Sequence, residues 1–183
     1  MFLEYGTHGS QLYSLPLQDV DETFLKVQTF IDSIDISDGN GKEVVTQFKT
    51  NLLKDEAFGT DSNGMGMIRR RWNNRPTWNL NYTNEPTSCN YYPVDSSLIF
   101  EGIDARNSSI AFAVVTDRSE GGTVRSSPKD TTAELMVHRR LLHDDGRGVG
   151  EALNETEPWD TDKGLKLLTS HGLLLDSSDL ERR

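Results

Sequence analysis

Short stretches of alternating apolar and polar residues, separated by turn residues, recur along the chain, whereas the apolar spacing of amphipathic helices is weak. Residues 24–36 alternate in this way. Residues 43–52 resume the alternation after the sequence Ser-Asp-Gly-Asn-Gly-Lys at 37–42, whose residues favour turns. Because a glycine- and asparagine-rich turn joins the two stretches, we predict that they pair as a β-hairpin.

The same pattern predicts further strands downstream, joined by turns. Strands are expected at residues 65–72, 97–100, 109–116 and 134–142. Residues 134–142 also fit a helix, but the turn residues on both sides favour a strand. Turns or tight loops are expected at residues 61–64, 104–107 and 144–148. Strands at this spacing, with no long helix between them, predict an all-β fold built as an antiparallel β-sandwich.

Length and composition bound the class of protein. The 183 residues suffice for one ordinary domain, and 34% of them are hydrophobic, which is polar for a compact domain. This polarity indicates either loop-rich ends or a face that packs on something outside the chain. The single cysteine, Cys89, excludes an internal disulfide framework.

Charge argues against some partners. The net charge of -10 argues against binding to nucleic acid, which needs a clustered positive face. The run Arg69–Arg71 can form salt bridges or bind an anion, and in an acidic domain we favour salt bridges. The sequence contains no apolar run of 18 or more residues, so no membrane span is predicted. The first residues lack the features of a signal peptide.

Several motifs give the chain a resemblance to a known family. They are Asp-Gly-Asn-Gly-Lys-Glu-Val-Val-Thr at 38–46, Arg-Pro-Thr-Trp at 75–78, Asn-Tyr-Tyr-Pro-Val at 90–94, Thr-Asp-Arg-Ser-Glu-Gly-Gly at 116–122 and the stretch 134–151. In this order and spacing they resemble the β-rich C-terminal region of glycoside hydrolase family 38, the α-mannosidases, in its lysosomal branch.

The resemblance covers roughly residues 27–155, so it divides the chain into three parts. Residues 1–24 match poorly, residues 25–158 are expected to form the β-sandwich, and residues 159–183 a further strand pair or a tail. The charged end 179–183 is expected to be loose.

The resemblance implies that the intact enzyme is a zinc-dependent retaining α-mannosidase, which trims mannose from N-glycans. In that family the nucleophile and the zinc ligands lie in an N-terminal catalytic domain, and their motifs are missing from this sequence. We therefore expect no catalytic residue and no bound metal in this chain. The expected partners are a mannose-containing oligosaccharide and the catalytic domain of the same enzyme. The implied location is the lysosome, the vacuole or the secretory pathway.

Two patterns imitate catalytic chemistry. His143 and Asp145 have the His-x-Asp spacing of a zinc-binding pair, but no third ligand is near in sequence, so we do not expect a metal there. Asp144 and Asp145 resemble an acid/base pair, but neighbouring side chains point apart, and aspartate before glycine is ordinary turn chemistry.

Arg147 is the expected substrate-binding residue. The resemblance implies that the Asp-Asp-x-Arg-Gly loop reaches toward the sugar pocket, where a guanidinium can donate to sugar hydroxyls. The alternative is that Arg147 pairs with Asp144 or Asp145 and only holds its own loop. For the isolated chain we expect this alternative.

Other side chains are assigned structural roles. Trp72, Trp78, Tyr91 and Tyr92 have faces that can stack on sugars, but aromatic residues at this density in a sandwich are more often core, and we expect core. Asp117 and Arg118 are expected to pair within their loop.

Three sequons, at Asn81, Asn107 and Asn154, are candidate N-glycosylation sites. About two would occur by chance at this composition, so they indicate the secretory pathway only weakly. The predicted function is part of an α-mannosidase, with this chain supplying scaffold and part of the substrate pocket and inactive by itself. The alternatives are a free-standing carbohydrate-binding module and a truncated product without a role of its own.

Overall fold

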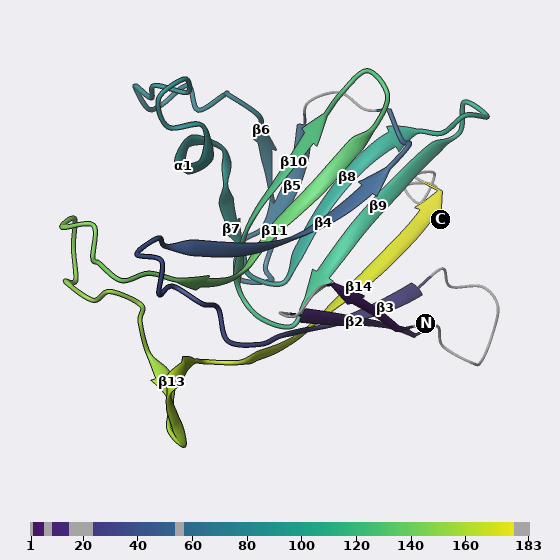
Figure 1. Cartoon of the computed structure of the whole chain (residues 1–183). Coiled ribbons are helices and arrows are strands. Elements are labelled where there is room, and N and C mark those ends of the chain that lie inside the picture. Colours follow the sequence, from purple (N-terminus) through teal and green to yellow (C-terminus); the bar gives the residue numbers. More distant parts are fainter. Residues whose placement is uncertain (1, 6–8, 15–23, 54–56, 178–183) are drawn as a thin grey trace.

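The computed structural model describes residues 2–5, 9–14, 24–53 and 57–177. Within these ranges the regular secondary structure is almost entirely strand, and the single helix, α1 (Pro86–Asn90), has five residues. No helix of the described part is long and apolar enough to cross a membrane. The prediction of an all-β antiparallel sandwich is confirmed (Figure 1).

Two antiparallel sheets form the sandwich, and a small hairpin stands beside them. The large sheet contains, in spatial order, β1 (Phe2–Tyr5), β2 (Gly9–Ser14), β3 (Phe24–Ile31), β14 (Leu167–Ser177), β9 (Ser109–Thr116), β8 (Ser97–Ile103), β5 (Ala57–Asp61) and β6 (Met67–Arg71). The second sheet contains β4 (Lys42–Thr50), β11 (Thr131–Arg140), β10 (Glu120–Ser126) and β7 (Tyr92–Val94). The hairpin pairs β12 (Thr156–Glu157) with β13 (Asp160–Gly164).

The main core lies between the two sheets. The large sheet contributes buried side chains such as Leu98, Phe100 and Val114, and the second sheet contributes residues such as Val124 and Leu135. Along β8 and β11 buried and less buried residues alternate, which is the pattern of strands with one face on the core. A smaller cluster is formed by Ile31, Ile34, Ile36 and Val137.

One predicted pairing is wrong. Residues 24–31 and 42–50 are strands, but they do not form a hairpin, because β3 pairs with β2 and β14 whereas β4 pairs with β11 in the other sheet. The connection between them buries Ile34 and Ile36 against Val137. Residues 32–41 therefore cross from one sheet to the other, and their apolar residues pack in the space between.

The other strand and turn predictions hold. The strands at 65–72, 97–100 and 109–116 correspond to β6, β8 and β9, and the ambiguous stretch 134–142 falls largely in strand β11. Turns lie at Ser62–Gly64 and Ala105–Asn107.

The C-terminal part of the chain forms strands that belong to different sheets. β13 pairs only with β12 among the described strands, whereas β14 pairs with β3 on one side and β9 on the other (Figure 1). The expected loose end at 179–183 lies outside the described residues. The large sheet takes strands from all three predicted parts of the chain, and the division itself stays a prediction.

A buried carboxylate joins two turns at one end of the sandwich. Asp61, which is 4% exposed, accepts backbone N–H groups from Asp95, Ser96 and Ser97 at 2.8 to 3.0 Å and from Gly64 at 2.9 Å. Burial alone would raise the pKa of this carboxyl, but these donors outweigh it and hold the pKa well below its ordinary value. The β5–β6 turn and the β7–β8 turn are thus fixed to one charged group.

Replacing Asp61 with asparagine is expected to lower the free energy of unfolding by about 2–3 kcal/mol at neutral pH, because the amide directs a donor at N–H groups that need an acceptor. Since the folded-state pKa is depressed, the stabilisation is complete above the unfolded-state pKa of about 3.9 and is lost as the pH falls below it. Urea unfolding from neutral pH to about pH 3 measures both effects.

The matched control is Asp104→Asn. Asp104 accepts the N–H groups of Arg106 and Ser108 in an exposed turn, so its replacement is expected to cost less than about 1 kcal/mol. Equal losses in the two variants would contradict a special role for Asp61.

Candidate functional site: the loop after strand β11

The loop that carries Arg147 leaves the end of β11 and returns to β12. The backbone N–H of Leu141 donates to the carbonyl of Leu153 at 3.2 Å and closes the base of the loop. Leu142 packs against the small cluster around Ile36, so the base is anchored. Residues 143–151 are exposed, and the loop extends beyond the ends of β4 and β11 (Figure 1).

The two aspartates of this loop shape its backbone. Asp144 accepts the N–H of Gly146 at 2.8 Å, and Asp145 accepts the N–H of Arg147 at 2.9 Å. Gly146 has a φ of 70°, a left-handed conformation that glycine adopts readily. The aspartates therefore act as turn formers, as their sequence context predicts.

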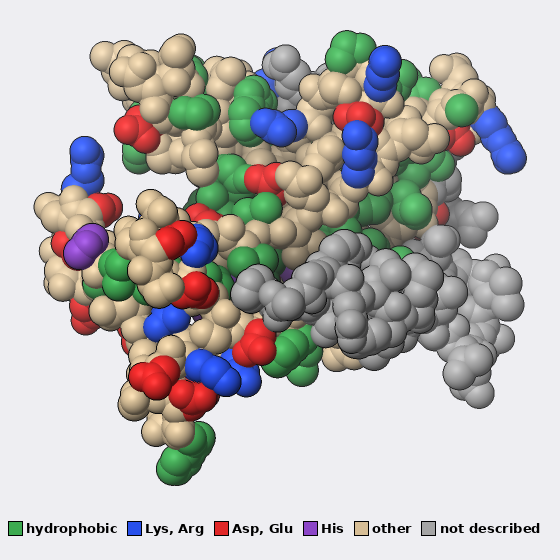
Figure 2. All heavy atoms as spheres, in the orientation of Figure 1, with side chains coloured by type: hydrophobic (Ala, Val, Ile, Leu, Met, Phe, Trp, Pro, Cys, Tyr) green, Lys and Arg blue, Asp and Glu red, His purple; other side chains and the backbone are tan. Residues whose placement is uncertain are grey.

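The side chain of Arg147 is free in the described part of the chain, where its guanidinium makes no ion pair or hydrogen bond. The expected pairing of Arg147 with Asp144 or Asp145 is therefore wrong. Both carboxylates instead accept backbone N–H groups of their own loop. Figure 2 shows charged side chains of both signs on the side of the molecule that carries this loop.

The residues of the described chain do not fit a zinc site. No group of three or more His, Cys, Asp or Glu side chains gathers in a way that could hold a metal ion within these residues. His143 is exposed, and Asp145 is engaged with its own loop backbone. The described residues therefore do not provide the ligand set of a zinc site.

The four aromatic residues expected in the core differ in how far they are buried. Tyr92 is buried and belongs to the main core cluster, which confirms the prediction for that residue. Trp72 and Tyr91 are half-buried, and the Arg125 guanidinium lies 5.5 Å from the Trp72 ring centre. Trp78 is 63% exposed, so the prediction is wrong for it. It lies in the irregular segment between β6 and α1, where no sheet face covers it.

The expected pair of Asp117 and Arg118 is present, with the Arg118 Nε 3.0 Å from Asp117 Oδ1. Asp117 also accepts the Thr169 hydroxyl at 2.7 Å, and Arg118 donates to the Leu168 carbonyl at 2.8 Å. Burial by itself raises the pKa of Asp117, but the Arg118 and Thr169 donors hold it below its ordinary value. This loop is thus tied to β14 and has a structural role.

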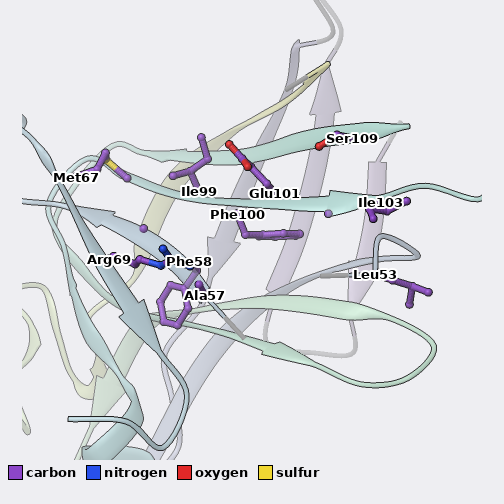
Figure 3. Close-up of a pocket in the computed structure, with 12 residues that line it drawn as sticks. Leu53, Ala57, Phe58, Met67, Arg69, Ile99, Phe100, Glu101, Ile103 and Ser109 are labelled. Carbon is purple, nitrogen blue, oxygen red and sulfur yellow. The ribbon is translucent and has the colours of Figure 1, made fainter. Parts of the chain in front are cut away.

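An open hollow of about 640 Å³, which the sequence did not predict, lies in the large sheet beside β5 and β8 (Figure 3). Its walls come from β5, β6 and β8, and Leu53, Met67 and Ile103 are about half exposed there. No residue of the 141–155 loop lines it. The hollow is therefore separate from the Arg147 site.

The three sequon asparagines are all exposed. Asn107 has a φ of 63° in the β8–β9 turn, and the Asn81 side chain accepts the N–H groups of Thr83 and Asn84. Their positions leave room for a glycan.

Comparison with known proteins assigns the chain to a family. The model of the glycosyl hydrolases family 38 C-terminal domain matches residues 10–147, which is most of the chain. The chain belongs to glycosyl hydrolase family 38. The resemblance read from the motifs at 75–78, 90–94 and 134–151 is thereby confirmed.

Several curated proteins resemble this family 38 chain. Lysosomal alpha-mannosidase of Bos taurus is 44% identical over 155 residues, which are 85% of this chain and 14% of the relative. Lysosomal alpha-mannosidase of Dictyostelium discoideum is 46% identical over 132 residues, 72% of this chain and 12% of the relative. Alpha-mannosidase of Canavalia ensiformis is 39% identical over 135 residues, 74% of this chain and 13% of the relative. The chain thus spans no more than 14% of the length of these relatives.

Because the Arg147 guanidinium has no partner in the described chain, Arg147→Ala is expected to leave the free energy of unfolding within about 0.5 kcal/mol of the wild type. Urea unfolding of the purified chain measures it.

The matched control is Arg140→Ala in the same region. The Arg140 Nη1 donates to the Ile34 carbonyl at 2.6 Å, so this variant is expected to lose about 1–3 kcal/mol. A loss for Arg147→Ala as large as that for Arg140→Ala would mean that Arg147 holds the loop, and the expectation would be wrong.

Proposed function

We propose that this chain is part of an α-mannosidase that hydrolyses terminal α-mannose residues of N-glycans. In this proposal the sandwich is a scaffold, and the 143–151 loop completes the substrate pocket of the intact enzyme. One observation carries the proposal: in a chain that belongs to family 38, the arginine expected to bind substrate stands unpaired on an exposed, backbone-stabilised loop.

The chemistry of Arg147 suits a sugar ligand. Its guanidinium offers a planar set of N–H donors, which can bind two neighbouring sugar hydroxyl oxygens or a carboxylate beside them. Gly146 and Gly148 lack side chains on either side of it, so a sugar ring can approach the loop closely. We propose that Arg147 binds and orients the substrate and takes no part in proton transfer, since an arginine stays protonated.

The bond-breaking groups are proposed to lie in the part of the enzyme outside this chain. Retaining glycosidases need two carboxyl groups about 5–5.5 Å apart across the sugar, one as nucleophile and one as acid/base. Asp144 and Asp145 are occupied by backbone N–H groups of their own loop, which argues against them in these roles. The resemblance implies that the intact enzyme contains zinc, and the described residues of this chain do not fit its ligand set.

The location and modification of the intact protein form part of the same proposal. Relatives named lysosomal alpha-mannosidase support a lysosomal or secretory location. Asn81, Asn107 and Asn154 are proposed as N-glycan acceptors, because each is an exposed sequon.

The native protein recovered from its source with an antibody to this chain is expected to be several times larger than 20.6 kDa and to hydrolyse 4-nitrophenyl α-mannoside. The purified 183-residue chain alone is expected to show no such hydrolysis, with or without added zinc. A native species near 20.6 kDa, allowing for glycans, would contradict the proposal. It would leave a carbohydrate-binding module or a truncated product as the remaining functions, and mannose binding by the chain would distinguish them.

In the intact enzyme, Arg147→Ala is expected to lower kcat/KM for the same substrate by about 10- to 100-fold, the range that loss of a charged hydrogen-bond donor of about 1.5–3 kcal/mol allows. Initial rates over a range of substrate concentrations give kcat and KM separately.

Arg106→Ala is the control, since Arg106 lies in the exposed β8–β9 turn and not in the 143–151 loop. A variant Arg147→Ala with the kinetics of Arg106→Ala would exclude Arg147 from the substrate pocket while leaving the mannosidase assignment intact.

A further inference from the structure

Two segments that are separate in sequence meet beside strand β6. Asn90 is fully buried; its side chain accepts the N–H of Asn73 at 2.6 Å and donates to the Asn73 side chain at 2.8 Å. The Arg75 Nη2 donates to the Tyr91 carbonyl at 2.8 Å. The Arg-Pro-Thr-Trp segment at 75–78 is thus fastened to the Asn-Tyr-Tyr-Pro segment at 90–93, and the two form one rigid unit.

Two guanidinium groups share one aromatic ring in this unit. The central carbons of Arg70 and Arg75 lie 4.7 and 4.2 Å from the centre of the Tyr92 ring. Arg70 is also held by its Nε, which donates to the Thr60 hydroxyl at 3.1 Å. Tyr92 is buried and donates its own hydroxyl to the Arg71 carbonyl, so the ring that positions both arginines is fixed.

The two positive charges have no negative partner in the described part of the chain. No carboxylate there forms an ion pair with Arg70 or Arg75, so the salt bridges expected for the Arg69–Arg71 run are not made by Arg70. The Nε of Arg75 is buried and makes no hydrogen bond within these residues. A buried donor without an acceptor is costly, so an acceptor that enters the cavity would stabilise it.

The arginines line an open cavity of about 310 Å³, at the lower end of the size of small-molecule sites. Its walls contain no acidic residue, although the protein carries a net charge of -10. They include Asn74 and Thr77, whose side chains can donate hydrogen bonds, and the exposed ring of Trp78.

The electrostatics of this cavity favour an anion. Burial lowers the pKa of the Arg70 guanidinium; Tyr92 acts in the opposite direction, and the nearby charge of Arg75 again lowers the pKa. The Tyr92 ring attracts both cations, but a cation–π contact contributes only about 0.5–1 kcal/mol at partly exposed sites. Two like charges held together without a counter-ion are relieved by a bound oxyanion.

We propose that the cavity formed by Arg70, Arg75, Trp78 and Tyr92 is a binding site for an oxyanion, that is, a carboxylate, phosphate or sulfate group. Arginine pairs bind such groups through parallel N–H donors, and Trp78 lies where it can cover the ring or chain that bears the group. The site is distinct from the Arg147 loop and does not depend on mannosidase activity.

The oxyanion can come from two sources. It can belong to a separate ligand, such as an acidic sugar, or it can be an aspartate or glutamate side chain from the rest of the intact protein. An oxyanion from either source would bind through the same arginine donors. Comparing anion binding by the isolated chain and by the intact protein distinguishes the two sources.

The first experiment titrates the purified 183-residue chain with sodium sulfate, and separately with sodium acetate, at constant ionic strength. The Nε–H signals of the arginines are followed by NMR. At least one of the two anions is expected to shift the Arg75 signal saturably, and Arg70→Gln is expected to weaken that anion's binding about tenfold or more. Arg106→Gln is the control and is expected to bind as the wild type does.

Two results of this titration would overturn the proposal. One is no saturable shift of the Arg75 signal with either anion. The other is equal binding by Arg70→Gln and Arg106→Gln, which would show that sulfate or acetate acts elsewhere. Where Arg70→Gln loses its fold, Arg70→Lys replaces it, because lysine keeps the charge but lacks the paired N–H donors of the guanidinium. Anion binding by Arg70→Lys that equals the wild type would contradict a role for those donors.

The same titration of the intact protein distinguishes the sources. Saturable binding there, again weakened in Arg70→Gln, identifies an open site for a separate anionic ligand. Absence of added binding in the intact protein, with saturable binding in the isolated chain, identifies an internal carboxylate that already fills the cavity.

Discussion

Strand β14 is the element on which the large sheet depends, because it lies between β3 and β9 and pairs with both. Its residues Leu167–Leu174 pair with β3, and residues 171–177 pair with β9, so it joins the N-terminal strands to the rest of the sheet. It is also fixed across the sandwich. The Nε2 of its buried His171 lies 3.1 Å from Oε2 of Glu120, a buried residue of β10 in the second sheet. Such a pair is a poor source of net stability, but breaking it would leave an unpartnered polar group in the core. It therefore joins the middle of the large sheet to the second sheet through one polar contact in the core.

Because the strands of the sandwich are held in place, the strand ends from which its loops leave are held as well. Strand β11 pairs with β4 along its length, with a register shift between Met136 and His138. At its end Arg140 donates to the Ile34 carbonyl, in the segment that crosses between the sheets. The exposed 143–151 loop therefore leaves from a stem that is held by β4 and by the segment crossing between the sheets. The same logic applies to Asp61 at one end of the sandwich, where one carboxylate sets the position of two turns.

Local features of the fold could be predicted from the sequence, and pairings distant in sequence could not. The strands around 97–116 and 134–142 followed from alternation and from Asx and glycine turns, which are properties of neighbouring residues. The hairpin between 24–36 and 43–52 was wrong because nothing local shows that residues 32–41 change sheets. The role of Arg147 came from family resemblance, while its freedom from Asp144 and Asp145 depends on backbone geometry. The cavity around Arg70 was missed because Tyr92, 22 residues further along the chain, completes it. The Asn-Tyr-Tyr-Pro motif that contains Tyr92 was the available signal.

The two arginine sites differ in how much of their binding geometry this chain already provides. Arg70 and Arg75 are held by Thr60, Tyr91 and Tyr92, so an anion that enters their cavity meets donors already in place. Arg147 stands on an exposed loop with no contact to orient its side chain, so binding through it alone must first restrict several rotatable bonds. A sugar hydroxyl, which is neutral, offers less interaction energy to offset that restriction than an oxyanion does. If Arg147 binds substrate as proposed, its loop needs another surface to hold it and the substrate together, whereas the Arg70 cavity already holds its donors in place for an anion of either source.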